Sequence, residues 1–135
     1  MKRRIYYYDT DCGGVVYYAN YLKFLEEART KYMEERGLSL KGLMDKNIMF
    51  AIRRQEIEYK APAVYGDILE IKTRVLEVTG FRIRFVYEIR NQKSTLLSTA
   101  VTDMVSVGKD FKLKELPKEV RKLFLDQLGS VKKSI

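Results

Sequence analysis

Hydrophobic residues near the start of the chain recur at the spacing of an α-helix. Four of them stand at i, i+4, i+7 and i+11, which puts them on one stripe of a helix over residues 18–36. Phe24 and Met33 widen this stripe, so the helix should be buried over much of its girth. Gly37 suits the left-handed position that ends a helix. The four stripe residues are Tyr21, Leu25, Ala28 and Tyr32.

A strand pattern follows in the middle of the chain. Apolar side chains occupy the odd positions from 81 to 89, and mostly charged side chains occupy the even positions between them. Short turns separate this strand from its neighbours, so segments 67–78, 81–90 and 95–108 predict an antiparallel meander. The other expected elements are a strand over 1–8, a short helix over 39–46 capped by Ser39, a strand over 48–60 and a helix after Pro117.

These elements together predict the architecture. A long apolar helix cannot stand alone in water, and antiparallel strands have one face to bury. The economical arrangement is an α+β fold in which a curved antiparallel β-sheet wraps around the helix, as one domain over residues 1–135. Such a sheet exposes an edge strand, which a second copy would cover. We therefore expect a homodimer with a continuous sheet, which leaves further assembly into a homotetramer open.

The composition narrows the chemistry. The chain of 135 residues contains no histidine, which excludes Ser-His-Asp and Cys-His machinery, histidine metal ligands and a histidine base. Cys12 is the single cysteine, so neither an internal disulfide nor a multi-cysteine metal site is expected. Any catalysis must rest on carboxylates, hydroxyls, lysine or backbone dipoles. No apolar run is long enough for a transmembrane segment and no signal-peptide pattern is present, which favours a cytoplasmic protein.

The charge balance favours anionic partners. With 26 basic and 18 acidic side chains, the net charge is +8, which suits nucleic acid, a membrane surface or a phosphorylated small molecule. The basic residues are dispersed, however, and no recognition helix, basic cluster or aromatic groove for a single strand is evident. A nucleic-acid partner is therefore not expected.

An acidic loop precedes the long helix and is the candidate for chemistry. It reads Asp9-Thr10-Asp11-Cys12-Gly13-Gly14, so two carboxylates lie in a sharp turn before a helix start. The start of a helix offers unpaired N–H groups, and a carboxylate near such donors suits acyl chemistry. The alternative is that the acidic residues only cap the helix or turn the chain. The local pattern by itself favours that capping interpretation.

The signature around this loop resembles that of the hotdog-fold acyl-CoA thioesterases, in the branch of 4-hydroxybenzoyl-CoA thioesterase and the thioesterases encoded beside Tol–Pal genes. The likeness continues through RRQEIEYKAPA (residues 53–63) and covers most of the chain, up to about Gly108. The motifs that carry it are Asp9-Thr10-Asp11, Gly14-Val15-Val16-Tyr17, Ala19-Asn20-Tyr21, Glu27-Ala28-Arg29 and Gly66-Asp67.

The resemblance implies an activity and a site. Asp11 matches the family's catalytic carboxylate, as nucleophile or as general base for water. The chain around Tyr17 and Tyr18 matches the place where backbone N–H groups polarise the thioester carbonyl. Pantetheine would run along the dimer interface, and no metal or bound organic cofactor is needed because CoA is part of the substrate. The positions expected to contact substrate are Gly14, Val16, Tyr17, Arg53, Lys60, Arg90 and Lys93, the basic ones through the CoA phosphates.

Position 18 leaves an alternative open. The Tol–Pal type usually has a histidine where this chain has Tyr18, whereas the 4-hydroxybenzoyl-CoA type is similar to this chain in having tyrosine. A backbone N–H would survive the exchange, but the preference for the acyl group need not. The second interpretation is therefore a hotdog module that binds acyl-CoA or acyl-carrier protein without turnover.

Overall fold

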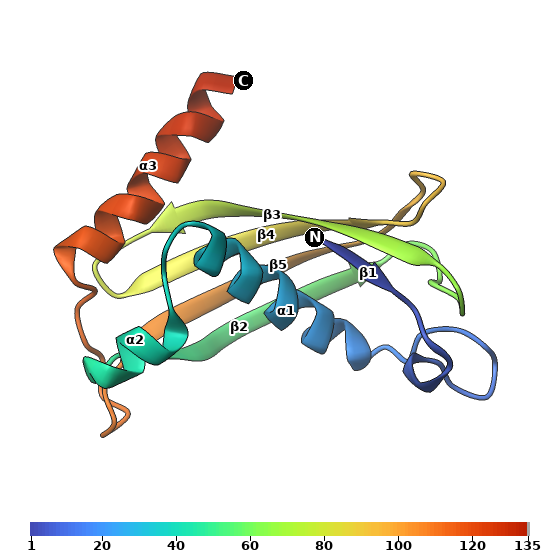
Figure 1. Cartoon of the computed structure of the whole chain (residues 1–135), viewed down its shortest axis with the longest axis horizontal. Helices are drawn as coiled ribbons and strands as arrows, with labels where there is room; N and C mark the ends of the chain where they lie inside the picture. The colour runs from blue at the N-terminus through green and yellow to red at the C-terminus, as the bar shows by residue number, and fades with distance from the viewer. Residues whose placement is uncertain (135) are drawn as a thin grey trace. The chain divides into compact units, whose positions relative to one another are not determined.

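The computed structural model describes the backbone of residues 1–134 and the side chains of residues 1–128. Its elements are labelled in Figure 1. In chain order they are β1 (Lys2–Arg4), a 3₁₀ turn (Tyr7–Asp9), α1 (Asn20–Glu35), α2 (Leu40–Asp45), β2 (Met49–Tyr59), β3 (Ile68–Val78), β4 (Arg82–Arg90), β5 (Leu96–Val107) and α3 (Lys118–Ser134).

The five strands form one sheet in the order β1-β3-β4-β5-β2. The neighbouring positions of β3, β4 and β5 confirm the meander expected from the short turns between them. The strand β1 pairs antiparallel with β3, with Arg3 opposite Leu69. The two edges of the sheet are therefore β1 and the much longer β2. No helix within residues 1–134 combines the length and the apolar character that crossing a membrane requires.

The chain divides into two compact units, and most strands contribute to both. The first unit contains Met1–Tyr32, Glu56–Thr73 and Tyr87–Ala100. The second contains Met33–Gln55, Arg74–Val86 and the chain from Val101 onward. The expectation of a single domain over residues 1–135 stays a prediction.

The core of the first unit lies between α1 and the sheet, as Figure 1 shows for the N-terminal part of the helix. Tyr21, Leu25, Ala28 and Tyr32 are all buried, which confirms the predicted stripe, and Phe24 is fully buried beside them. The strands contribute alternate residues to this core because successive side chains of a strand point to opposite faces. The buried strand residues of this unit are Leu69, Ile71, Tyr87, Ile89 and Leu97.

The second unit has its own apolar core. The ring of Phe85 on β4 meets that of Phe124 on α3 edge-on, with ring centroids 6.2 Å apart. Val75 on β3, Ile83 on β4 and Val120 on α3 are buried as well. The odd positions of β4 from 83 to 89 are all buried, as the alternation predicted, whereas Phe81 precedes the strand and is exposed.

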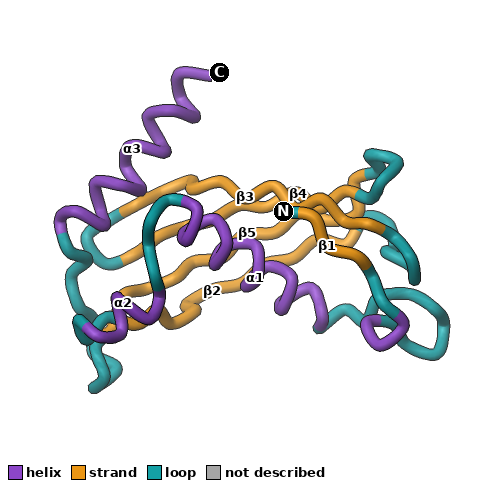
Figure 2. Tube along the Cα trace, in the orientation of Figure 1, coloured by secondary structure: helices purple, strands orange, loops and turns teal. Residues whose placement is uncertain are grey.

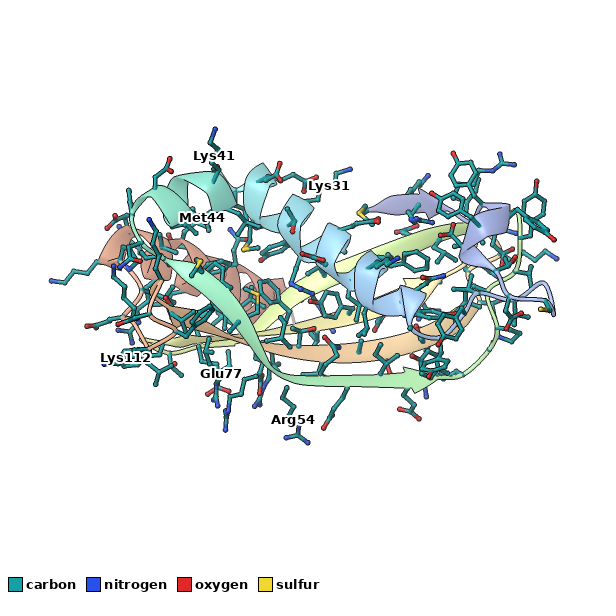
Figure 3. All side chains as sticks on the ribbon, turned by 90° about the horizontal axis from the view of Figure 1, so that it is seen from below. Lys31, Lys41, Met44, Arg54, Glu77 and Lys112 are labelled. Atoms are coloured by element: carbon teal, nitrogen blue, oxygen red, sulfur yellow. The ribbon has the colours of Figure 1, made fainter. Side chains whose placement is uncertain are left out.

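Charged side chains cover the other face of the sheet in the second unit. Figure 3 shows Arg54 and Glu77 projecting from the sheet on the side away from α2. On β5 the buried carboxylate of Asp103 accepts two hydrogen bonds from Arg84, at 2.7 and 3.2 Å. These bonds lower the pKa of Asp103, and its burial only partly opposes them. The carboxylate of Glu77 pairs with Arg82 at 3.1 Å.

The helix ends follow from local chemistry. Gly37 has φ +86°, which only glycine adopts without strain, and it closes α1 as the sequence predicted. The Leu38 N–H bonds to the Met33 carbonyl and the Gly37 N–H to the Glu34 carbonyl, which together form a Schellman motif. The short helix α2 is capped as expected, because Ser39 Oγ accepts the Gly42 N–H at 3.1 Å.

The predicted first strand is too long. It was expected over residues 1–8, but β1 ends at Arg4 and a 3₁₀ turn follows at Tyr7–Asp9. The cause is the carboxylate of Asp9, which accepts the backbone N–H of Tyr6 at 2.9 Å and so bends the chain into a turn. Three consecutive tyrosines favour a strand by propensity, but this local hydrogen bond overrides them.

Candidate functional site

The segment between β1 and α1 forms a closed loop, drawn mostly in teal in Figure 2. The Asp11 N–H bonds to the Val15 carbonyl at 2.9 Å, and the Gly14 N–H bonds back to the Asp11 carbonyl at 3.1 Å. Gly14 has φ +78°, so this tight reversal depends on a residue without a Cβ. Thr10 and Val16 face each other across an antiparallel bridge at the base of the loop. The tip is thus held at a fixed place before the helix.

The carboxylate of Asp9 holds this loop in place through buried hydrogen bonds. This carboxylate is buried and accepts a hydrogen bond from Arg3 at 2.6 Å in addition to the Tyr6 N–H. The Arg3 guanidinium also pairs with Glu27 at 3.3 Å and lies over the ring of Phe24, 4.3 Å from its centroid. Burial lowers the pKa of Arg3, but the hydrogen bond and charge of Asp9, together with Glu27, outweigh that effect and raise it. This ion pair therefore ties β1, the loop and α1 together.

The backbone carbonyl of Asp9 completes the connection to the helix. It accepts the Asn20 side-chain amide at 2.9 Å and the Tyr17 N–H at 3.2 Å. Asn20 is the first residue of α1, two residues later than the sequence indicated. The start of the helix and the loop before it are consequently fixed to one peptide group.

Asp11 has the opposite environment to Asp9. It is exposed, and its Oδ1 accepts the N–H of Gly13 at 2.8 Å in a local turn. No ion pair to Asp11 is formed by the residues that the structure describes. Asp9 therefore carries an ion pair that holds the loop, whereas Asp11 carries none among the described residues.

Two backbone N–H groups before α1 remain without a hydrogen-bond partner in the described part of the chain. The Val16 N–H bonds to the Ala63 carbonyl and the Tyr17 N–H to the Asp9 carbonyl. The N–H groups of Tyr18 and Ala19 bond to no other described residue. They precede the first full turn of α1, where the helix dipole adds a partial positive charge. These two N–H groups are therefore available to donate hydrogen bonds to an oxygen that develops negative charge.

An open pocket of about 290 Å³ lies beside these donors. Its wall is mostly aromatic and aliphatic, and the ring of Tyr59 meets that of Tyr21 edge-on at 5.1 Å. Burial raises the pKa of Tyr21, so its phenol stays neutral. Such a surface suits an apolar group that leads to a polar reacting centre. The lining residues are Val15, Val16, Tyr18, Tyr21, Tyr59, Lys60, Ala61 and Pro62.

The chain is similar to known thioesterases along most of its length. The thioesterase-like superfamily matches residues 6–124. The chain belongs to this family. It is therefore a thioester hydrolase, as the resemblance of its loop and helix motifs implied.

Individual relatives agree with this assignment. The acyl-CoA thioester hydrolase YbgC of Escherichia coli is 40% identical over 118 residues, which cover 87% of this chain and 88% of that protein. The acyl-CoA thioesterase YbgC of Haemophilus influenzae is 38% identical over 124 residues, or 90% of each. The solved structure of the DHNA-CoA thioesterase of Staphylococcus aureus matches this chain with a TM-score of 0.94 and 24% identity. The match covers all of this chain and 93% of that protein. This likeness confirms the hotdog fold, a curved antiparallel sheet around a long helix.

The structure of the thioesterase brings together only part of the predicted site. Val16, Tyr18 and Lys60 line the pocket, and Gly14 and Tyr17 belong to the loop and the helix lead-in beside it. Tyr17 cannot offer its N–H in this geometry, because Asp9 already accepts it. Of these two positions, only Tyr18 keeps an N–H that bonds to no other described residue.

The other predicted basic residues do not line this pocket. Arg53 belongs to the second unit and lines a separate pocket of about 480 Å³ with Phe81 and Arg82. Arg90 pairs with Glu88 at 3.6 Å and donates to the Ser94 carbonyl. Lys93 is exposed in the turn after β4.

Several residues that hold the site together were assigned no role from the sequence. Glu27 pairs with Arg3 at 3.3 Å, because the half-buried guanidinium of Arg3 approaches it from β1. Asn20 and Asp67 stood inside the family motifs, yet each of them bonds to a main-chain group that the sequence does not display. The Asp67 carboxylate accepts the Val64 N–H at 2.9 Å and the Gln92 side-chain amide at 3.0 Å.

Proposed function

We propose that this thioesterase hydrolyses acyl-CoA to a free carboxylic acid and CoA. The proposal is supported by the acyl-CoA thioesterases among its relatives and by the pocket beside the start of α1. The observation that carries it is the pair of N–H groups at Tyr18 and Ala19, which bond to no other described residue. An apolar acyl group would occupy the pocket, and its thioester carbonyl would meet these donors. The activity fits the cytoplasmic location expected from the sequence, and the reaction needs no metal or bound organic cofactor.

The proposed chemistry uses Asp11 and the main chain. As general base, Asp11 takes a proton from water while the water oxygen adds to the thioester carbonyl. The carbonyl oxygen becomes an oxyanion, which the N–H groups of Tyr18 and Ala19 stabilise. The intermediate then collapses, the C–S bond breaks and CoA leaves as a thiolate that takes up the proton. As nucleophile, the Asp11 carboxylate would instead add to the carbonyl carbon and expel CoA as a thiolate. Water would then hydrolyse the resulting anhydride, which restores Asp11 and supplies the proton that CoA takes up, so both routes give the same products.

A second copy of the chain completes this site in our proposal. Asp11 is exposed and does not line the pocket of its own chain, whereas β2 is an edge of the sheet, eleven residues long. Edge strands of two copies can pair and extend the sheet, which would bring the loop of one copy to the other. The assembly would be a homodimer or a dimer of dimers, with CoA along the interface and its phosphates near basic residues such as Lys60.

The test compares Asp11→Asn with Asp110→Asn. Both aspartates are exposed and accept the N–H of the residue two positions ahead, Gly13 at 2.8 Å and Lys112 at 3.1 Å. Asparagine can accept the same N–H at either position, so the two variants differ in where the substituted residue lies in the fold. With a panel of acyl-CoA substrates and a free-thiol readout, Asp11→Asn should lower kcat by a factor of about 10² or more. Asp110→Asn should match the wild type.

Two results would contradict the proposal in different ways. Full activity in the Asp11→Asn variant would remove Asp11 from the mechanism. A wild-type protein that binds acyl-CoA but releases no thiol from any member of the panel would favour the non-catalytic binding module instead. Sedimentation of the protein as a monomer at assay concentration would contradict the shared site.

A further inference from the structure

Tyr59, the last residue of β2, reaches the peptide group that leads into α1. Its hydroxyl donates a hydrogen bond to the backbone carbonyl of Tyr18 at 3.1 Å. The same carbonyl accepts the N–H of Tyr21 at 3.3 Å, a longer bond that belongs to the first turn of the helix. A strand and a helix that are 41 positions apart in the sequence are thus joined at one carbonyl oxygen.

This carbonyl shares a peptide group with one of the two available donors. The Tyr18 C=O and the Ala19 N–H are parts of a single planar amide, so fixing the oxygen also fixes the direction of the N–H. A donor that bonds to the oxygen also draws electron density through the amide and makes its N–H a stronger donor. The Tyr59 hydroxyl therefore acts on the Ala19 N–H from the opposite end of the same peptide.

We propose that Tyr59 is a positioning residue of the thioesterase, which orients and polarises the Tyr18–Ala19 peptide so that its N–H can stabilise the oxyanion. This inference rests on the proposed hydrolysis of acyl-CoA at the start of α1. Tyr59 transfers no proton and forms no bond to substrate through its hydroxyl in this role. The hydroxyl serves the reaction only through the amide to which it donates.

The surroundings of Tyr59 suit this task. Its ring stands edge-on against the buried ring of Tyr21, which limits the directions in which the hydroxyl can point. Burial of the phenol and the nearby Tyr18 raise the pKa of Tyr59, so the group remains a proton donor at neutral pH. The donor is therefore both oriented and protonated before substrate arrives.

The test removes the hydroxyl alone. Tyr59→Phe keeps the ring, and the longer bond from Tyr21 still holds the carbonyl. Tyr65→Phe is the matched control, because Tyr65 is an exposed tyrosine whose ring contacts Tyr7 edge-on and lines no part of the pocket. With acyl-CoA as substrate, Tyr59→Phe should lower kcat about three- to tenfold and change KM less than about twofold. Tyr65→Phe should change neither constant.

A second measurement observes the amide directly. The ¹⁵N chemical shift of an amide responds to hydrogen bonding at the carbonyl of the same peptide. The Ala19 cross-peak in a ¹H–¹⁵N spectrum should therefore move in Tyr59→Phe and stay in place in Tyr65→Phe. This readout needs no turnover, and a purely structural role of the Tyr59 ring would not move it, since phenylalanine preserves the ring.

The possible outcomes separate this inference from the proposed function. A raised KM at unchanged kcat in Tyr59→Phe would show that the hydroxyl contacts substrate and would overturn the positioning role. An unmoved Ala19 cross-peak would overturn it as well. An inactive wild type, or an Asp11→Asn variant of full activity, would instead contradict the proposed function, while the Ala19 cross-peak would still report on the hydrogen bond.

Discussion

Substitution by asparagine should affect a different property at each of the two aspartates of the loop. Asp9 is buried and paired with Arg3, whereas Asp11 is exposed with a single local hydrogen bond to Gly13. Asp9→Asn should therefore reduce stability, and Asp11→Asn should reduce turnover without reducing stability. The two residues stand only two positions apart, but one is buried and the other is exposed, and this difference predicts their separate roles in stability and turnover.

The size of the Asp9 effect follows from its hydrogen bonds. One carboxylate oxygen, Oδ2, accepts both the Arg3 guanidinium and the Tyr6 N–H, and the residue is 3% exposed. A hydrogen bond to a charged group contributes about 1.5–3 kcal/mol, against about 0.5–1.5 kcal/mol between neutral groups. An amide keeps the acceptor but loses the charge, so Asp9→Asn should lower the free energy of unfolding by about 2 kcal/mol. Asp9→Ala, which leaves the guanidinium without its buried partner, should lower it by about 3–5 kcal/mol.

Urea unfolding followed by circular dichroism measures this difference. At a fixed protomer concentration, the midpoint for Asp9→Asn should fall by about 1 M with an unchanged slope. Asp11→Asn is the internal control and should stay within about 0.5 kcal/mol of the wild type. If Asp9→Asn unfolds at the wild-type midpoint, or if both variants are equally destabilised, the assignment of separate roles is wrong.

Two further predictions concern the second unit. Because Arg84 lowers the pKa of Asp103 in the folded state, this pair stabilises the fold above the unfolded pKa of about 3.9, and that stability is lost as pH falls through the folded pKa. Asp103→Asn should thus cost about 2–3 kcal/mol at pH 7, and a gap to the wild type that stayed constant below about pH 4 would contradict this origin. Gly37→Ala forces a side chain into φ +86° and should cost about 1 kcal/mol in thermal unfolding, with kcat unchanged; a variant as stable as the wild type would show that the turn relaxes.

Elements that follow from local periodicity were predictable from the sequence. The stripe of α1 and the alternation of β4 place each apolar side chain by its spacing from the next, and burial at these positions confirms both. The glycine that ends α1 was predictable for the same reason, since its backbone angle is a local requirement. The family of the chain was recognisable because its motif residues form short uninterrupted runs in the sequence.

Contacts between distant segments were not predictable in this way. The first strand was drawn too long because nothing in a run of tyrosines shows that Asp9 will accept the Tyr6 N–H. The pairing of Glu27 with Arg3 was not predictable, because the sequence shows the spacing of residues along a helix but not the approach of Arg3 from β1.

The side chains that shape this site mostly act on main-chain atoms, which explains why the sequence reveals the residues more readily than their roles. The Asn20 amide bonds to the Asp9 carbonyl, and the Tyr59 hydroxyl bonds to the Tyr18 carbonyl. In the proposed mechanism the electrophilic assistance comes from such peptide groups, and a peptide N–H has no residue type that marks it. Substitutions that preserve the backbone at Tyr18 should therefore be tolerated better than substitutions at the residues that hold it.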